Sequence, residues 1–315
     1  MNSLTQRHDL SDVARGALIL LVVWGHLLET NGTNGRLYFA IYTFHMPAFV
    51  MLAGMFSAAK LNAHDLMIIV KKFVIPLIAF QLAYFYALGI VSPNRVTNLQ
   101  TPAWLIWFLF SLITWKLILP FAVRVPYRIP LSLIVALAAG YIDSISAAWS
   151  LSRTVVFFPA FLLGHLYKDQ IFQVVTNYRP ALCVVFVALI CGAFVISDHV
   201  TIRWLWAVKP YSEILNSSPE ILYRAGAIAT GLIASVAFLA VLPQRSQWLM
   251  FLGQNTMPIY VLHGFPVMLV WKAKVLPNSE FAFLAATAVL AIILTLAIAR
   301  AASPIVKNKQ FGRPT

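Results

Sequence analysis

Four ionisable side chains follow one stripe of the first apolar stretch, namely Asp12, Arg15, His26 and Glu29. In an α-helix, eleven residues turn by about 1,100°, close to three full turns, so Arg15 and His26 share a face about 16 Å apart. Asp12 precedes Arg15 by three residues, and Glu29 follows His26 by three, so each is a neighbour on that face. Ionisable groups are costly in hydrocarbon, and their presence there predicts a function.

These residue types predict acid–base chemistry. A histidine can act as a general base near neutral pH, and we assign this role to His26. Glu29 would hold the imidazole in one tautomer and stabilise the imidazolium. Arg15 would bind a phosphate or thioester group of a donor, with Asp12 orienting it. We expect Arg15 and His26 to face one protein-lined cavity; the alternative is that His26 and Glu29 lie hydrated at the outer interface without a role.

Polar and aromatic residues recur in later apolar stretches. His45 precedes Pro47, which distorts a helix and frees a backbone carbonyl. We predict that the substrate is contacted by a set drawn from four stretches: His45, Trp107, Arg153, Asn255, Tyr260 and His263. Structural alternatives remain open for several of them: a bond to a neighbouring helix for His45, an interfacial aromatic belt for Trp107, snorkelling for Arg153 and helix capping for Asn255.

Composition indicates which elements must position these residues. Of 315 residues, 61% are hydrophobic and only 10% are charged. A soluble domain is about half apolar and a quarter charged. This excludes a cytosolic enzyme, a disordered chain and a secreted disulfide scaffold, and predicts an all-α polytopic membrane protein. We predict about ten transmembrane helices, over residues 13–28, 37–59, 66–91, 103–123, 129–149, 154–167, 181–197, 221–242, 248–275 and 281–302.

The net charge of +13 indicates basic cytoplasmic loops facing anionic lipid rather than a nucleic-acid partner. Lys and Arg are more frequent in the segments that are inner when the N-terminus is inside, so we expect both termini in the cytoplasm. Cys183 and Cys191 lie about 12 Å apart along one predicted helix, which excludes a disulfide between them. No residue cluster has the spacing of a metal site, and no phosphate-binding or dinucleotide motif is present.

Several motifs resemble those of acyltransferase family 3, the membrane O-acyltransferases of bacteria. The pair Arg15 and His26, separated by ten residues, is similar to the Arg-x10-His signature of that family, and Asp12-x-x-Arg15-Gly16 resembles its opening. The segments 44–47 (Phe-His-Met-Pro) with Gly54, 107–109, Arg153 with 157–164, and 255–263 follow in the same order. They look most like the fucose 4-O-acetylase-like branch.

The resemblance implies a ten-helix acyltransferase domain over 8–303, followed by a basic cytoplasmic tail at 304–315. It implies a multi-pass protein of the bacterial inner membrane with His26 as catalytic base and Arg15 essential for donor handling. The donor would be cytoplasmic acetyl-CoA or another acyl-CoA, acting as a co-substrate rather than a permanently bound cofactor. Its phosphates would be held by basic residues, with the candidates Arg15, Lys71, Lys72 and Arg128. The acceptor would be a hydroxyl of a carbohydrate or glycolipid.

Alternatives remain open for the function and for the reaction. A transporter or flippase of a lipid-linked sugar would also need polar groups in its helices and a basic inner face. Transporters often carry inverted repeats and paired broken helices, which the sequence does not clearly show. Transfer could be direct, or could pass through an acyl-histidine. His45 and Arg153 are both candidates for the group that stabilises the oxyanion.

Overall fold

The computed structural model describes residues 3–32, 35–92, 100–214 and 220–310, and these residues form helices and connecting turns without a strand. The α-helices that carry or support the candidate site are α1 (Ser3–Leu28), α2 (Arg36–Met55), α5 (Trp107–Ala122), α7 (Leu151–Leu166), α10 (Arg203–Trp206), α12 (Gln247–Gln254), α13 (Thr256–Leu262), α14 (Gly264–Ala273) and α15 (Glu280–Gln310). The remaining α-helices are α3 (Ala63–Ile69), α4 (Ile75–Val91), α6 (Arg128–Ala138), α8 (Lys168–Asn177), α9 (Arg179–Ile196) and α11 (Glu220–Val241).

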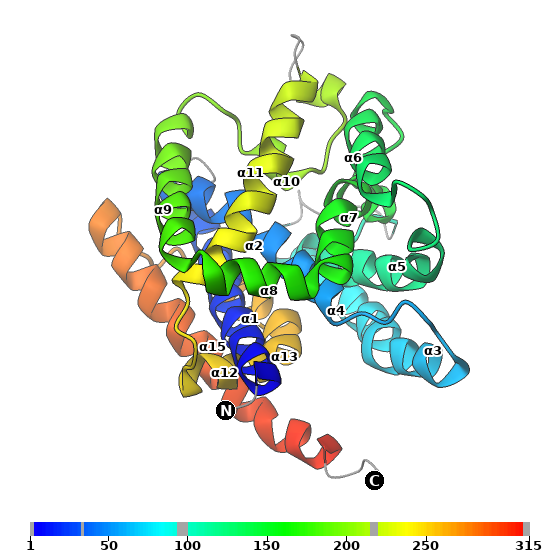
Figure 1. Cartoon of the computed structure of the whole chain (residues 1–315). Helices are drawn as coiled ribbons and strands as arrows, with labels where there is room; N and C mark the ends of the chain where they lie inside the picture. Colours follow the sequence, from blue (N-terminus) through cyan, green and yellow to red (C-terminus); the bar gives the residue numbers. More distant parts are fainter. Residues whose placement is uncertain (1–2, 33–34, 93–99, 215–219, 311–315) are drawn as a thin grey trace.

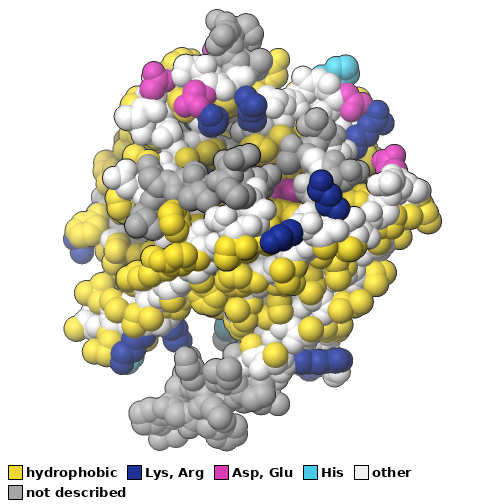
Figure 2. Space-filling model, turned by 180° about the vertical axis from the view of Figure 1, so that it is seen from behind, with side chains coloured by type: hydrophobic (Ala, Val, Ile, Leu, Met, Phe, Trp, Pro, Cys, Tyr) yellow, Lys and Arg dark blue, Asp and Glu magenta, His cyan; other side chains and the backbone are white. Residues whose placement is uncertain are grey.

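Seven helical segments among the described residues are long and apolar enough to cross a membrane: Arg7–Leu28, Arg36–Met55, Ala63–Val91, Trp104–Ala122, Arg179–Ile196, Glu220–Val241 and Glu280–Ser303. The prediction of an all-α polytopic membrane protein is confirmed. The number of ten and the side on which the termini lie stay predictions. In Figure 1, α1 begins and α15 ends at the same end of the molecule. Hydrophobic side chains cover the middle of the face in Figure 2, and most charged ones lie toward its two ends.

The predicted ninth span, 248–275, is wrong as one continuous helix, because the chain forms α12, α13 and α14 there. A proline lacks the amide hydrogen that bonds to the carbonyl four residues earlier, and its ring clashes with that carbonyl. Pro258 lies four residues after the end of α12 at Gln254, and Pro266 lies four residues after the end of α13 at Leu262. The two prolines therefore account for both breaks.

One other predicted span also differs from the structure. The predicted fifth span, 129–149, is helical through α6 and the 3-10 turn Ala139–Tyr141, and the next helical turn is the 3-10 turn Ala148–Ser150. Residue Ile142 is extended, and the Asp and Ser residues that follow are weak helix formers. The predicted tail, 304–315, begins inside α15, which ends at Gln310, and its last five residues lie outside the described part of the chain.

Four glycines allow the helices that carry the site to approach closely. A Cβ atom on Gly16 of α1 would lie 1.9 Å from the Leu249 carbonyl oxygen, and one on Gly253 of α12 equally close to the Asp12 carbonyl oxygen. The same reciprocal arrangement joins α2 to α7 through Gly54 and Gly164. A Cβ atom on either glycine would lie 2.0 Å from a carbonyl oxygen of the other helix. Small residues at helix crossings permit such approach in membranes. α1 also packs on α2, which places both helices at the centre of the site.

Candidate active site

The end of α1 carries the histidine–carboxylate pair that the spacing predicts. The His26 Nδ1 atom lies 3.1 Å from Glu29 Oε1, and Glu29 begins the 3-10 turn Glu29–Asn31 directly after the helix. A carboxylate only accepts hydrogen bonds, so Nδ1 carries the proton. The Nε2 atom of His26 then keeps its lone pair, which is the tautomer that a general base requires.

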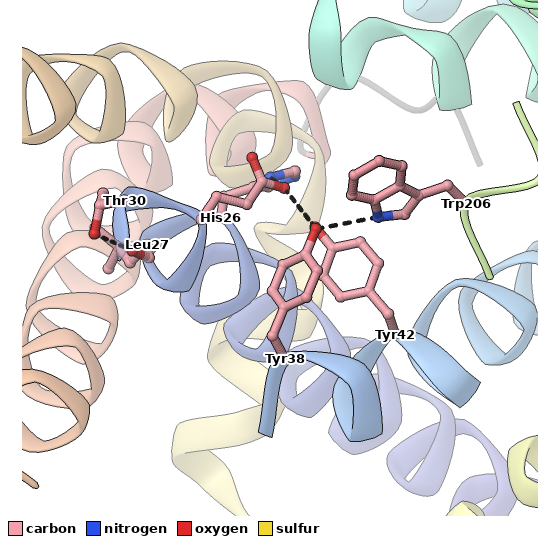
Figure 3. A network of polar contacts seen from close by, with 7 residues as sticks. His26, Leu27, Thr30, Tyr38, Tyr42 and Trp206 are labelled. Atoms are coloured by element: carbon pink, nitrogen blue, oxygen red, sulfur yellow. Dashed lines mark hydrogen bonds and ion pairs between the residues drawn. The ribbon is translucent and has the colours of Figure 1, made fainter. Parts of the chain in front are cut away.

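Two tyrosines and a tryptophan hold the Glu29 carboxylate in place (Figure 3). The hydroxyl of Tyr42 donates to Glu29 Oε1 at 2.8 Å, and that of Tyr38 donates to the same oxygen at 3.1 Å. The indole nitrogen of Trp206 donates to the Tyr38 hydroxyl at 3.2 Å. Burial raises the pKa of Glu29, but the adjacent His26 and these hydrogen bonds lower it, and the net pKa lies below its ordinary value. The carboxylate is therefore ionised and fixed beside the imidazole.

His26 and Glu29 line a cavity of about 310 Å³ between α1, α2, α5, α7 and α10. The rest of its wall is aromatic, apolar or basic, and consists of Tyr42, His45, Met46, Trp104, Trp107, Arg153, Phe157, Leu205 and Trp206. The ring of Trp104 meets the His26 imidazole edge-on, with centroids 4.6 Å apart. The cavity is large enough for a small ligand, and it presents one histidine–carboxylate pair to that ligand.

Three of the predicted substrate residues, His45, Trp107 and Arg153, line this cavity. His45 Nδ1 donates to the Ile41 carbonyl oxygen at 2.8 Å, so its Nε2 is free of a proton. The Arg153 guanidinium carbon lies 4.6 Å from the centroid of the Trp107 ring, and Arg153 Nε donates to the Trp206 carbonyl oxygen at 3.1 Å. Arg153 is thus held inside the protein, and the snorkelling alternative does not describe it.

The other three predicted substrate residues are absent from the wall of this cavity. Asn255 Nδ2 donates to the Phe251 carbonyl oxygen at 2.8 Å, and the Tyr260 hydroxyl donates to the Leu105 carbonyl oxygen. His263 Nδ1 bonds to the Ile259 carbonyl oxygen, while its ring stacks on His26 with centroids 5.4 Å apart. Asn255 and His263 therefore bond to carbonyls of α12 and α13, Tyr260 joins α13 to the 3-10 turn Trp104–Ile106, and His263 is the member of this set that contacts the catalytic pair.

Arg15 and Asp12 lie near the middle of α1, about three turns before His26. Arg15 Nη2 pairs with Asp12 Oδ1 at 3.0 Å, as predicted, and the guanidinium carbon lies 5.0 Å from the centroid of the Phe56 ring. The prediction that Arg15 and His26 face one cavity is wrong for this structure, since Arg15 is absent from the wall of the His26 cavity. The reason is packing: Ile19 and Val23, between the two along α1, are fully buried in the apolar core.

The remaining predicted donor-binding residues are spread over the fold. Lys71 and Lys72 are exposed on a π-helical turn, Val70–Val74, between α3 and α4. Arg128 begins α6, and its Nη1 atom donates to the Val123 carbonyl oxygen at 3.0 Å. It also lines a separate apolar cavity of about 220 Å³. Their role in donor binding stays a prediction.

Tyr38 and Tyr42 are the functional candidates that the sequence reasoning did not identify. Both lie on α2, four residues apart, and His45 follows Tyr42 by three. This spacing places the three side chains on one helical face, which was a usable signal. Trp104 and Trp206 also line the cavity, although the sequence reasoning did not place either in the site.

The comparison with protein families agrees with this geometry. Residues 10–300 match the acyltransferase family 3 model, described as an acyltransferase domain. The chain belongs to acyltransferase family 3. No curated protein and no solved structure matches the chain. The predicted family is confirmed, and with its apolar helices the protein is a membrane acyltransferase; the fucose 4-O-acetylase-like branch stays a prediction.

Proposed function

We propose that this protein transfers an acetyl or similar acyl group from cytoplasmic acyl-CoA to a hydroxyl of a sugar, as an enzyme of the bacterial inner membrane. The observation that carries the proposal is the His26–Glu29 pair, 3.1 Å apart, in the wall of an aromatic-lined cavity. The family assignment favours this chemistry over a transporter or flippase of a lipid-linked sugar.

The reaction follows from the tautomer of His26. Its Nε2 atom takes the proton of the acceptor hydroxyl as the hydroxyl oxygen attacks the thioester carbonyl carbon. Glu29 stabilises the imidazolium that forms. The carbon–sulfur bond then breaks, and the departing thiolate takes the proton from the imidazolium. Arg153, which lines the same cavity, is the candidate for stabilising the oxyanion. His45, whose Nδ1 donates to the Ile41 carbonyl oxygen, has a donor for the oxyanion only as the imidazolium. A path through an acyl-histidine would need the same stabilisation of the oxyanion.

Donor binding is proposed at the Arg15 end of α1. Arg15 and Lys168 both lie against the Phe56 ring, at 5.0 and 4.2 Å from its centroid. Two cations at one exposed aromatic ring suit a phosphate-bearing ligand. The thioester at the end of the flexible arm of coenzyme A would then have to travel about 16 Å along α1 to reach His26. In the present structure buried apolar side chains occupy that path, so the proposal requires them to move apart when the donor binds.

The acceptor would occupy the His26 cavity. Trp104 and Trp107 in its wall present aromatic surface suited to the apolar face of a sugar ring. Fucose, another deoxysugar, a capsule or lipopolysaccharide unit and a small glycoside all fit this description.

His26→Ala tests the proposal. Bacterial membranes containing the full chain are supplied with radiolabelled acetyl-CoA, and acetyl transfer to cell-surface glycans is measured together with protein level. We expect a fall of about 10²–10⁴-fold at unchanged protein level, because a general base contributes that much. His64→Ala is the matched control, since His64 is exposed on α3 outside the cavity. Undiminished transfer by His26→Ala would show that the base is assigned wrongly.

A further inference from the structure

A second cavity adjoins the His26 cavity at the end of the molecule where α1 ends. It has a volume of about 390 Å³, and it shares Glu29 with the first cavity. Its wall is formed near the ends of α1, α4 and α14, by the turn between α14 and α15 and by the start of α15. The residues of the wall are Glu29, Thr30, Val91, Ser92, Val270, Trp271, Lys272, Lys274, Leu276, Pro277, Asn278 and Phe283. The proposed reaction does not use this space.

The partition between the two cavities is aromatic and acidic. The rings of Trp104 and Trp271 touch, with centroids 4.5 Å apart, and Trp104 lines one cavity while Trp271 lines the other. Glu29 is the residue that borders both. Figure 2 shows an acidic side chain set back from the surface at this end of the molecule, with basic side chains beside it. A ligand in the second cavity would thus lie next to the carboxylate that orients His26.

Lys272 and Lys274 place two positive charges in the wall of this cavity. Two other basic residues at this end have ion-pair partners: Arg36 pairs with Asp198 at 2.6 Å, and Lys209 pairs with Glu213. Within the described part of the chain, neither Lys272 nor Lys274 has an acidic group at ion-pair distance. Two cations in the wall of one cavity attract an anionic ligand.

The backbone at Lys274 argues that its side chain matters. Lys274 caps α14 in the left-handed conformation, with φ 50°. Glycine, and less often asparagine, is the usual residue in that conformation because a Cβ atom is disfavoured there. The turn alone would be formed better by either of those residues. A lysine at this position therefore points to a role of its ammonium group.

We propose that this second cavity binds an anionic unit of the sugar acceptor, bearing a carboxylate or a phosphate, through Lys272 and Lys274. The inference rests on the proposed function and names the acceptor class. Glu29 repels the anionic group, which keeps it at the lysine end of the cavity. The neighbouring, uncharged unit of the glycan then lies across the partition in the His26 cavity, with its hydroxyl toward His26, which requires the touching rings of Trp104 and Trp271 to move apart. Trp271 offers an aromatic surface to the sugar ring between them.

Three substitutions separate the charge of the cavity from its shape. Lys272→Gln removes one charge within α14, and Lys274→Asn removes the other while keeping a residue that tolerates the left-handed conformation. Arg203→Gln is the matched control, because Arg203 is an exposed cation on α10 that lines neither cavity.

The test measures saccharide binding to the purified full chain in nanodiscs of zwitterionic lipid, by calorimetry at low and moderate salt. The probes are tetragalacturonate, glucose 6-phosphate, neutral maltotetraose and inorganic phosphate. We expect at least one anionic saccharide to bind about tenfold or more tightly than maltotetraose, with affinity falling as salt rises. The uronate and phosphate probes distinguish the two anionic groups. Inorganic phosphate shows whether the sugar ring contributes.

The Lys272→Gln/Lys274→Asn double variant should lose that preference, and Arg203→Gln should keep it. Equal binding of anionic and neutral saccharides by the wild type, or undiminished anionic binding by the double variant, would overturn the inference. The binding assay contains no acetyl-CoA, so its result does not depend on the transfer reaction. Failure of the proposed transferase function would therefore appear in the acetyl-transfer assay, and failure of the anionic-acceptor inference in the binding assay.

Discussion

The middle of α1 and its C-terminal end carry the same pattern, an acidic and a basic residue three positions apart, in two different surroundings. In the middle of the helix, the Asp12–Arg15 pair is partly exposed, with 19% and 32% of the two side chains accessible. Where the helix ends, the His26–Glu29 pair is 15% and 11% exposed and lines the cavity. The spacing of three residues is enough to bring the two side chains of each pair into contact. The burial of the pair, and therefore its chemistry, depends on the helices packed around it.

The partners of the two carboxylates differ in kind. Asp12 accepts from Arg15 and, at 3.2 Å, from Gln254 Nε2 on α12. Glu29 accepts hydrogen bonds from an imidazole and two tyrosine hydroxyls, and none of these three donors carries a permanent charge. A carboxylate beside a permanent guanidinium orients a cation for an anionic ligand, whereas one beside an imidazole stabilises a transient positive charge.

The strongest way to break this comparison is Glu29→Gln. The amide keeps the size of the side chain but cannot stabilise an imidazolium, and it can present a donor to His26 Nδ1 and select the wrong tautomer. We expect acetyl transfer to fall on the order of 10²–10⁴-fold, the range for a triad acid, with little change in the KM for acetyl-CoA. Single-turnover transfer from radiolabelled acetyl-CoA measures it.

Asp12→Asn is the comparator for that variant, since it makes the same chemical change near the middle of α1. It should affect the KM for the donor more than the transfer rate. Equal losses of transfer rate in Glu29→Gln and Asp12→Asn would contradict the division of roles between a reacting pair at the end of α1 and a donor-binding pair near its middle.

A smaller effect is expected from Arg15→Lys. Lysine keeps the charge but replaces the planar fork by a point charge, and the contact with the Phe56 ring is lost. A hydrogen bond to a charged group is worth about 1.5–3 kcal/mol, so the KM for acetyl-CoA should rise about 10- to 100-fold. Steady-state kinetics at varied donor concentration gives KM and kcat separately. A fall in kcat alone, at unchanged KM, would remove Arg15 from donor binding.

The sequence predicted the parts of the site that depend on local helical spacing. His26 with Glu29, and Asp12 with Arg15, are three residues apart on one helix, so their contacts follow from helical geometry alone. The contact of Tyr42 with Glu29 depends on how α2 crosses α1. At that crossing Gly25 of α1 faces the Tyr42 ring, and a Cβ atom on Gly25 would lie 3.1 Å from it, a contact that periodicity does not reveal.

The same distinction explains the helices. Apolar stretches identify spans because hydrocarbon requires them, and seven such segments are present in the described chain. The breaks in 248–275 occur at two prolines, and a backbone carbonyl near a break accepts a hydrogen bond from a residue far away in the sequence. The Tyr84 hydroxyl, for example, donates to the Val261 carbonyl oxygen at 2.9 Å, across 177 positions of sequence. Hydropathy merges α12, α13 and α14 because it contains no information on such long-range partners.

The smallest expected effect, and the sharpest test of how Glu29 is held, comes from Tyr42→Phe. It removes the 2.8 Å hydrogen bond to Glu29 and leaves the ring in place. One such bond is worth about 0.5–1.5 kcal/mol, so we expect transfer to fall by about 2- to 12-fold. Tyr86→Phe, at a tyrosine 70% exposed on α4, is the matched control and should transfer normally.

Tyr38→Phe should resemble Tyr42→Phe, because Tyr38 donates to the same oxygen and also accepts from Trp206. Loss in both single variants, together with a greater loss in the double variant, would show that the two hydroxyls hold the carboxylate jointly; wild-type transfer by the double variant would show that His26 alone fixes Glu29.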